Sequence, residues 1–566
     1  MKTRLSAETE IYQSKFSPIR TCFITQQVSG HLLSGLTAKQ SLLFASRFKN
    51  AQASGADHEA VARKWLTELG LEGAANTKVE YCSGGERQRL ALGLELTSTE
   101  MPNLALIDEP TSNLDSYSAE TVIRVLRRLT RVHPLAIVVT IHQPTVEVLQ
   151  KFEHLYVLAR GGVCIYSGGS TSEQMEQHLS SSSATAVSSS SDQSNSPIEV
   201  LIRHSCSGAE DRTVQRLVAR SNLQWSSSNA WQLSQEAQLT PDGVQRNRTR
   251  FSLYSVYVAF LRYSVAFRQH LWKEYLLISA NYLFYGVAIP LFYDRRMASL
   301  TGCINLESDF NVLCSRDAQG VEVVFQLLNN FKYSFFFANF FMIFVLLQQA
   351  LSFHKDLEVF TNEHRNGWIS CGSFYLTKSI FELLPLLPTI LLYVYLGNIY
   401  EAVLPGIYWN IVLLFIITAV TFQSQGQIFA ILSRGNISMI LILSVSVFLF
   451  SVLLSNFLLL ASRLSAFYLW LSNFAITRFI FEGFMLLQYG FGRCGANEIQ
   501  VILHVMKLTD DEYYHCILML LFNLVLYRCI AFYLFYSKFN PVENRRERLA
   551  RIEKHRKNAL KVVNIF

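Results

Sequence analysis

The sequence predicts two structural classes in one chain: an α/β domain over residues 1–175 and an all-α membrane domain over residues 251–540. In the first part, short apolar runs typical of buried strands alternate with segments whose apolar residues recur at helical spacing. In the second part, six apolar stretches approach the ~20 residues that a helix needs to cross a bilayer. A serine-rich linker over residues 176–250 and a basic tail over residues 541–566 complete the predicted order.

The composition agrees with a chain of two kinds of domain. At 566 residues the chain is too long for one domain, 50% of its residues are hydrophobic and 16% are charged. The net charge of +7 is modest, and the densest basic run lies beyond the last apolar stretch, so we expect no nucleic acid partner. The 10 cysteines show no C-x-x-C pair and no metal-ligand spacing, which predicts mostly free thiols.

A pair of glycines precedes a predicted helix. Ser83-Gly84-Gly85 opens a run whose apolar residues, among them Leu90 and Leu94, recur at helical spacing. Two glycines let backbone N–H groups approach an anion, and a helix N-terminus favours negative charge. For Ser-Gly-Gly alone, a turn before a surface helix is the better explanation.

Two acidic residues follow a buried strand. Leu104 to Ile107 is a short apolar run, and Asp108 and Glu109 come directly after it. Ligands of open α/β sheets bind at the carboxyl ends of the strands. There Asp108 suits a water-coordinated Mg²⁺ and Glu109 suits polarising an attacking water, although a solvated acidic turn would contain the same residues.

A histidine follows a second buried strand. Ile137 to Thr140 is apolar and short, and His142 lies two residues beyond it. A lone histidine in such a place is more often structural than catalytic. Its position after the Asp-Glu strand favours a contact with the γ-phosphate of a nucleotide.

In this order the segments resemble the ATP-binding cassette transporters. C-S-G-G-E resembles their signature motif, with Cys82 and Glu86 in place of the usual Leu and Gln. L-A-L-I-D-E resembles Walker B, and S-N-L-D, from Ser112 to Asp115, resembles the D-loop. His142 matches the switch histidine of the family.

The beginning of the chain extends the resemblance. Cys22 to Gln26 is a predicted strand that ends in glutamine, and Gln26 matches the Q-loop glutamine, which in the family touches Mg²⁺ and the attacking water. The following L-T-A-K-Q-S-L-L-F-A-S-R-F resembles the family's next helix. E-R-Q-R, T-I-H-Q-P and the order of the two domains are similar to the G subfamily, the White-type half-transporters, over almost the whole chain.

The resemblance implies a dimer, with itself or with another half-transporter, whose nucleotide domains meet head to tail and use ATP and Mg²⁺. It implies catalytic roles for Glu109, which positions the water, and for His142 and Gln26. It assigns Mg²⁺ to Asp108 and Gln26. It assigns the partner's nucleotide to Ser83, Gly84, Gly85 and Glu86, and coupling of the two sites to Asp115. The implied cargo is a small amphipathic or lipid-like molecule or a pigment precursor.

The sequence contains no phosphate-binding P-loop, G-x-x-x-x-G-K-S/T, since no glycine is followed by lysine. Gly30 and Gly35 have the glycine spacing, but Leu36 stands at the lysine position. In the family the P-loop precedes the Q-loop, which predicts that this chain is truncated before the Q-loop. We favour an incomplete gene model or a short isoform. The alternative is a natural chain that completes one site on a partner with an intact P-loop, and so acts as a regulatory or catalytically incomplete subunit.

The membrane part begins with a predicted amphipathic interfacial helix from Phe251 to Phe267, for which a surface helix on the first domain is the alternative. Six predicted spans follow: Tyr275–Tyr293, Tyr333–Phe353, Tyr375–Leu396, Ile407–Ala430, Ile437–Leu460 and His515–Tyr536. Six spans put both termini on one side, and the need for ATP makes it the cytoplasmic side of a plasma or intracellular vesicle membrane. The basic tail agrees with this orientation, whereas Arg295 and Arg296 argue against it.

Two membrane segments add to the resemblance. V-F-T-N-E-H-R-N-G-W (Val359–Trp368) resembles the subfamily's V-F-x-R-E-H-x-x-G-x-Y loop between spans two and three. The resemblance implies a cytoplasmic loop that leans on the nucleotide domain through Glu363 and His364, with a solvated turn as the alternative. F-I-F-E-G-F (Phe479–Phe484) resembles the re-entrant stretch before the last span.

Polar residues inside the predicted spans are costly in lipid, so they should face protein or water. They are Lys378, Glu382, Gln423, Gln425, Gln427 and Arg528. We expect hydrogen bonds between helices as their first role and substrate contact as their second. On the outer side, Cys303 and Cys314 could pair within the chain, which would leave Cys494 for a partner subunit.

Overall fold

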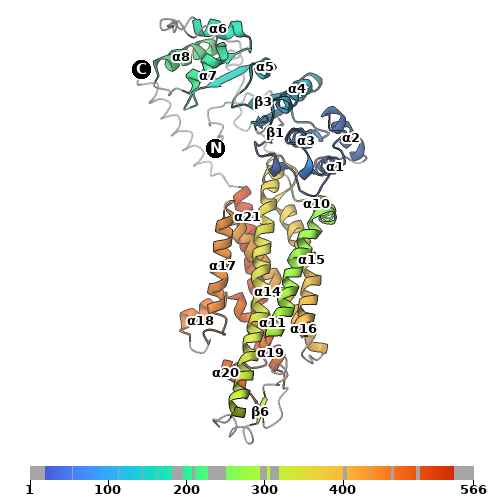
Figure 1. Ribbon diagram of the computed structural model, residues 1–566, viewed down its shortest axis with the longest axis vertical. Helices are drawn as coiled ribbons and strands as arrows, with labels where there is room; N and C mark the ends of the chain where they lie inside the picture. The colour runs from blue at the N-terminus through green and yellow to red at the C-terminus, as the bar shows by residue number, and fades with distance from the viewer. Residues whose placement is uncertain are drawn as a thin grey trace.

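The computed structural model describes residues 20–53, 55, 57–112, 114–142, 144–160, 162–180, 196–206, 211–226, 250–292, 303–305, 318–398, 405–433, 435–460, 464–492 and 498–540. Both predicted parts are present. An α/β domain stands on one end of a bundle of long helices (Figure 1).

The α/β domain is built around a three-stranded parallel sheet in the order β1-β2-β3. Its elements are β1 (Thr21–Ile24), η1 (Val28–His31), α1 (Ala38–Lys49), α2 (His58–Glu68), η2 (Val79–Tyr81), α3 (Gly84–Leu96), β2 (Leu104–Asp108), α4 (Ser116–Val132), β3 (Ala136–Thr140) and α5 (Val146–Leu149). The register pairs Ile24 with Ile107 and Asp108 with Thr140, so the carboxyl ends of the strands lie at one edge. All three predicted strands are confirmed.

Part of the predicted linker is folded onto this domain. The antiparallel hairpin β4 (Leu155–Leu158) and β5 (Cys164–Gly168) is followed by α6 (Ser172–Ser180), α7 (Pro197–Ser205) and α8 (Arg212–Ser226). Leu201 of α7 packs with Tyr166, and Leu217 of α8 packs with Ile165, because both helices carry apolar residues on one face. These helices extend the first domain beyond residue 175. Residues 181–195, the serine-rich run, lie outside the described residues.

The second part is helical. It consists of α10 (Leu253–Ala266), η4 (Phe267–Leu271), α11 (Trp272–Phe292), β6 (Cys303–Asn305), α14 (Ala318–Arg365), α15 (Cys371–Asn398), α16 (Pro405–Leu432), α17 (Ile437–Leu453), α18 (Ala466–Ser472), α19 (Ile476–Tyr489), β7 (Glu498–Gln500), α20 (Val501–Met506) and α21 (Glu512–Phe539). β6 and β7 form a small antiparallel pair that joins the segment before α14 to the segment before α20.

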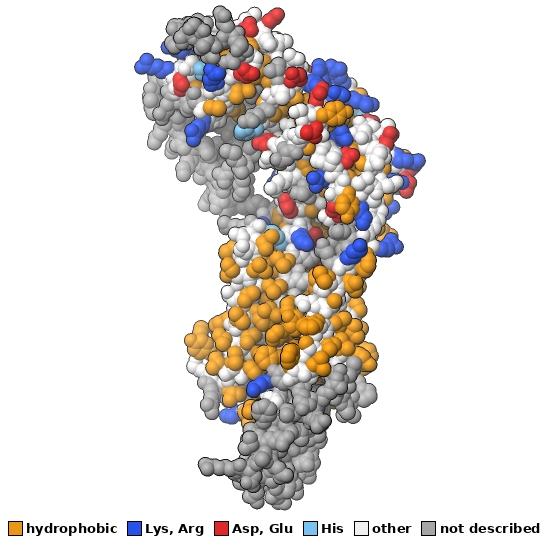
Figure 2. Space-filling view, in the orientation of Figure 1, with side chains coloured by type: hydrophobic (Ala, Val, Ile, Leu, Met, Phe, Trp, Pro, Cys, Tyr) orange, Lys and Arg blue, Asp and Glu red, His pale blue; other side chains and the backbone are white. Residues whose placement is uncertain are grey.

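Among the described residues, five helices are long and apolar enough to cross a membrane, namely α11, α14, α15, α16 and α21. The fifth predicted span, Ile437–Leu460, corresponds in part to α17, which ends at Leu453 after 17 residues. α14 is longer than predicted, since its 48 residues continue past Phe353 to Arg365 and reach the α/β domain. On the face shown in Figure 2, hydrophobic side chains cover most of the described helical part, whereas charged side chains gather on the α/β part.

The predicted helix before the first span is confirmed as α10, which continues into α11 through the π-helical turn η4. α10 packs against α15 of the membrane domain and α1 of the α/β domain. Val258 and Tyr263 are buried there, while Leu253 and Tyr257 are exposed. α10 therefore lies where the two domains meet.

Candidate functional site

Asp108 and Glu109 lie beside Thr140 at the carboxyl edge of the parallel sheet. The Thr140 hydroxyl donates a hydrogen bond of 2.6 Å to Oδ1 of Asp108. The Glu109 N–H donates to the Thr140 hydroxyl at 3.0 Å and to its carbonyl oxygen at 3.2 Å. Thr140 thereby fixes both acidic residues. Sequence reasoning missed it; its signal is a hydroxyl at the last position of the strand next to β2.

The backbone of Glu109 has a φ of 46°, in the left-handed region, where a residue with a side chain costs about 1–2 kcal/mol. Strain of this kind is characteristic of functional sites. The Glu109 carboxylate is held by two donors at the same oxygen: Gln26 Nε2 donates to Oε2 at 2.8 Å, and the Ser112 hydroxyl donates to Oε2 at 2.6 Å. The structure thus brings the predicted residues Gln26, Asp108 and Glu109 together.

His31 supports the segment that carries Gln26. The Thr25 N–H donates to His31 Nε2 at 3.1 Å, and the imidazole is only 5% exposed. Burial lowers the pKa of His31 to about 4, so the ring is neutral at neutral pH. Because Nε2 accepts from Thr25, the ring proton is on Nδ1. His31 was not predicted as a site residue. The sequence shows only that a histidine lies five positions after Gln26, and its burial is seen in the structure alone.

His142 lies in the segment after β3, two residues past Thr140, at the same edge as Asp108. Its side chain is exposed. Among the described residues, no hydrogen bond joins it to Asp108 or Glu109. It therefore lies at the predicted edge without being part of the hydrogen-bonded acidic centre.

The predicted signature residues form the start of α3. Ser83 is the N-cap: its hydroxyl accepts from Glu86 N at 3.2 Å, while Glu86 Oε2 accepts from Ser83 N at 2.8 Å. This capping box engages the Glu86 carboxylate in holding the helix start. The Ser83 side chain is otherwise exposed, and the free N–H groups of a helix N-terminus attract anions.

The start of α3 lies against the D-loop. A Cβ at Gly84 would be 2.8 Å from Leu114 Cδ2, and one at Gly85 would be 3.4 Å from Ser118 Cβ, so both glycines permit this close packing. Asp115 is the N-cap of α4 and accepts from Ser118 N at 3.1 Å. Hydrogen bonds from Ser118 lower the pKa of Asp115. Asn113 lies outside the described residues.

The loop between α14 and α15 contacts the α/β domain, as predicted, but the predicted contact residues were wrong. Glu363 forms a buried bidentate ion pair with Arg262 of α10. The Arg262 guanidinium is buried, and a buried charge is costly unless an opposite charge compensates it. His364 Nδ1 is 2.9 Å from the Ile369 carbonyl oxygen, and the His364 ring packs against Phe360 and Phe539 of the membrane domain.

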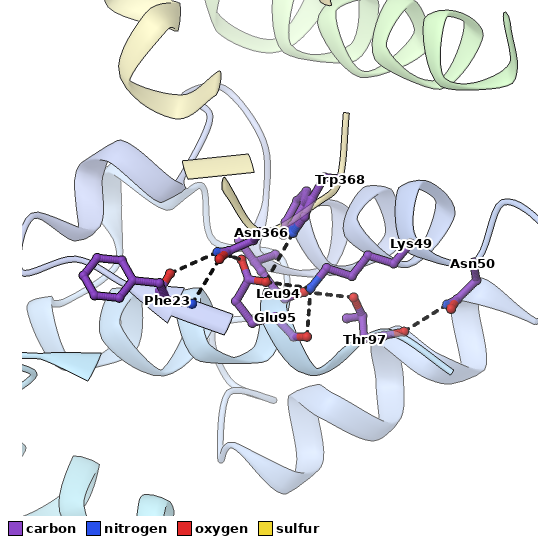
Figure 3. A network of polar contacts seen from close by, with 8 residues as sticks. All are labelled: Phe23, Lys49, Asn50, Leu94, Glu95, Thr97, Asn366 and Trp368. Atoms are coloured by element: carbon purple, nitrogen blue, oxygen red, sulfur yellow. Dashed lines mark hydrogen bonds and ion pairs between the residues drawn. The ribbon is translucent and has the colours of Figure 1, made fainter. Parts of the chain in front are cut away.

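Three other residues of the loop region make the hydrogen bonds to the α/β domain. Asn362 Nδ2 donates to the Gly30 carbonyl oxygen at 2.8 Å. Asn366 bonds both Phe23 and Glu95, and Trp368 Nε1 donates to Glu95 Oε2 at 3.2 Å (Figure 3). These three residues are uncharged, so neither composition nor spacing could identify them as contacts with the α/β domain.

Most of the polar residues that were predicted to join helices of the bundle do so. Lys378 of α15 pairs with Asp356 of α14 at 2.5 Å and with Glu382 of its own helix at 2.9 Å. Arg528 of α21 donates to Ser379 of α15 at 2.7 Å and to Gln427 of α16 at 3.2 Å. The predicted pairings of Cys303, Cys314 and Cys494 lie outside the side chains that are described.

Comparison with known proteins identifies both parts. The family model described as ABC transporter matches residues 4–112, and the model described as ABC-2 type transporter matches residues 268–489. An uncharacterized ABC transporter ATP-binding protein/permease of Saccharomyces cerevisiae is 32% identical over 26% of this chain and 12% of its own length. ATP-binding cassette sub-family G member 8 of Rattus norvegicus is 31% identical over 29% of this chain and 24% of its own length.

A longer match is Protein white of Drosophila melanogaster, which is 24% identical over 81% of this chain and 64% of its own length. The chain therefore spans less than two thirds of the length of each of these relatives. The matched families and the apolar helices together identify a multi-pass membrane protein with a nucleotide-binding domain.

Proposed function

We propose that this chain, which belongs to the White-type half-transporters of the ABC transporter G subfamily, is one half of an ATP-driven membrane transporter. The observation that carries the proposal is the contact of Gln26 with Glu109 beside Asp108, at the carboxyl edge of the sheet. As the two nucleotide domains of a dimer close on ATP, the membrane helices change between inward and outward access.

Glu109 is the residue that activates water in this proposal. Both hydrogen bonds to its side chain within the described residues use Oε2, so Oε1 keeps its capacity to accept a proton from water. Phosphoryl transfer needs mainly a positioned nucleophile and stabilised phosphate charge. Gln26 and Ser112 supply the positioning by fixing the carboxylate. His142 is exposed at the same edge and would contact the γ-phosphate of a bound ATP.

Mg²⁺ fits this site as a companion of ATP. Among the described residues, no group of three or more His, Cys, Asp and Glu side chains could hold a metal ion by itself. Mg²⁺ in nucleotide sites takes one or two protein oxygens and completes its shell with phosphates and water. Asp108 and the amide oxygen of Gln26 are the oxygens that would hold it, and the bound ion would neutralise phosphate charge.

The dimer in this proposal shares its nucleotides between subunits. The N-terminus of α3, where Ser83 is exposed, would offer the backbone N–H groups of Gly84 and Gly85 to the phosphates of an ATP on the partner. The D-loop beside it, with Asp115, connects the two sites. The partner is a second copy or another half-transporter. The nucleotide domain and both termini are cytoplasmic, and the cargo is a small amphipathic or lipid-like molecule or a pigment precursor.

The test is ATP hydrolysis by the full chain, reconstituted in lipid vesicles with a co-expressed half-transporter. We expect Glu109→Gln to lower the rate by about 100-fold or more, since a positioned general base contributes about that factor. Glu153→Gln, at an exposed carboxylate that follows α5 in the same domain, is the control. Equal rates for wild type and Glu109→Gln would overturn the proposal.

A further inference from the structure

Asn366, in the loop between α14 and α15, forms three hydrogen bonds with the α/β domain (Figure 3). Its Oδ1 accepts from the Phe23 N–H at 3.0 Å, and its Nδ2 donates to the Phe23 carbonyl oxygen at 3.0 Å. The second hydrogen of Nδ2 reaches Glu95 Oε1 at 2.7 Å. The side-chain amide of a membrane-domain residue therefore uses both of its donors and its acceptor on the other domain.

The two bonds to Phe23 complete an open sheet edge. Among the described residues, β1 pairs with β2 alone, with Phe23 opposite Leu106, and no strand lies along its other edge. An edge strand presents unpaired N–H and C=O groups, and Asn366 satisfies one of each. The Arg365 guanidinium lies 5.0 Å from the centre of the Phe23 ring and covers the same position. β1 ends two residues before Gln26.

The third bond reaches the helix that begins at Ser83. Glu95 lies in the last turn of α3, and its side chain is 3% exposed. Its carboxylate also accepts from Lys49 Nζ of α1 at 2.8 Å and from Trp368 Nε1 at 3.2 Å. A buried carboxylate with three donors fixes the side chains around it. Asn366 therefore joins the strand that leads to Gln26 to the helix that starts at the signature motif.

We propose that Asn366 is a positioning residue of the nucleotide site, through which the docked membrane domain holds β1 against α3 and so allows Gln26 to reach Glu109. This inference rests on the proposed function and deepens it. It makes the membrane domain a regulator of hydrolysis, because a loop that moves away releases the strand that carries Gln26. The hydrogen bonds of Asn366 go to Phe23 and Glu95 and not to Gln26, Asp108 or Glu109, so it should act on turnover rather than on nucleotide affinity.

The test uses Asn366→Asp, which keeps the size of the side chain and the acceptor for Phe23 N–H. It places an oxygen opposite both Glu95 Oε1 and the Phe23 carbonyl oxygen, where like charges and acceptors repel. We expect kcat for ATP to fall by about 10- to 100-fold, as misplaced catalytic groups do, with KM changed less than about twofold. Adding Glu95→Gln supplies an amide donor toward the introduced carboxylate, so the double variant should recover most of kcat. Lys78→Met, which removes a different interdomain bond to the Gln269 carbonyl oxygen, is the control.

Hydrogen–deuterium exchange of the full chain gives a readout that needs no activity. Asn366→Asp should speed exchange in residues 21–31 and in the last turn of α3, while α4 stays unchanged. Normal exchange in residues 21–31, wild-type kcat, or an equal loss in Lys78→Met would overturn the proposal. If Asn366→Asp fails to accumulate, the double variant is compared with Glu95→Gln alone, and a double variant no better than Glu95→Gln refutes it. Failure of the proposed function is distinct, since wild type would then show no hydrolysis sensitive to Glu109→Gln.

Discussion

The side-chain amide of Gln26 donates a hydrogen bond of 2.8 Å to Glu109, although 83 positions separate the two residues. The parallel pairing of β1 with β2 produces this contact, because both residues follow the carboxyl ends of adjacent strands. This contact joins Glu109, which we propose to activate water, to the segment after β1. β1 itself is bonded to the membrane domain through Phe23 and Asn366.

Replacing the hydrogen bond between Gln26 and Glu109 by a repulsion between two carboxylates should slow ATP hydrolysis. Gln26→Glu puts a second carboxylate against Glu109, whereas Gln26→Met only removes the hydrogen bond, which is worth about 1 kcal/mol or roughly fivefold. We expect Gln26→Glu to reduce the rate more than Gln26→Met in the vesicle assay. Gln27→Glu, at the exposed neighbouring position, is the matched control and should leave the rate unchanged. The same loss at both positions would show that charge at this surface matters and the contact does not.

Thr140 should be needed for its hydroxyl. Thr140→Val preserves shape but removes the donor to Asp108 and the acceptor for Glu109 N–H. We expect roughly a 30-fold loss of hydrolysis, since two net hydrogen bonds of about 1 kcal/mol each are lost. Thr140→Ser keeps both bonds and should stay close to wild type. A valine variant as active as the serine variant would contradict the role assigned to the hydroxyl.

His31 should make stability depend on pH. Burial lowers its pKa to about 4 from the ordinary value of 6.5, so between these values the unfolded chain binds the proton and the folded chain does not. The free energy of unfolding therefore falls as pH drops from 6.5 toward 4, by up to roughly 3 kcal/mol. His31→Gln retains an acceptor for Thr25 and should flatten this dependence. Thermal unfolding of the solubilised chain at pH 7.5 and 5 measures it, and identical slopes for both proteins would exclude His31 as the source.

Gly426 should be essential for the contact of α14 with α16. A Cβ there would lie 2.9 Å from the Leu346 carbonyl oxygen and 3.0 Å from Ala350 N, backbone atoms that move only if the helices separate. Alanine is favoured over glycine inside a helix by about 1 kcal/mol. We nevertheless expect Gly426→Ala to destabilise the chain by about 1–3 kcal/mol through overpacking. Gly73→Ala, with open space around it, is the control. A rise in unfolding temperature for Gly426→Ala would contradict the packing.

Much of the site could be predicted because strand ends are local features. A short apolar run followed by Asp108 and Glu109 identifies both the strand and the edge where ligands bind, and the same holds for Gln26. The role of Thr140 depends on register, since only the pairing of β2 with β3 brings its hydroxyl to Asp108. A threonine at the end of a strand is otherwise common.

The interdomain contacts could not be predicted because they depend on residues distant in sequence. Glu363 has the charge expected of a contact residue, yet it pairs with Arg262, which lies 101 positions away in the sequence. Asn366 is a neutral loop residue, and 343 positions separate it from Phe23. Helix ends were also uncertain: the apolar pattern defines the part of α14 within the membrane, while the helix itself continues through polar residues to Arg365.

The central claim is that one nucleotide is shared between the acidic edge of one subunit and the start of α3 in the other. The most direct measurement is ATP hydrolysis by vesicles containing Ser83→Asp, with Ser83→Thr as control. Aspartate is a good N-cap, so α3 keeps its start, but its charge would face the phosphates of the partner's ATP. The account predicts a loss of about 100-fold or more, with Gln26, Asp108 and Glu109 unaltered. Hydrolysis at the wild-type rate would contradict it.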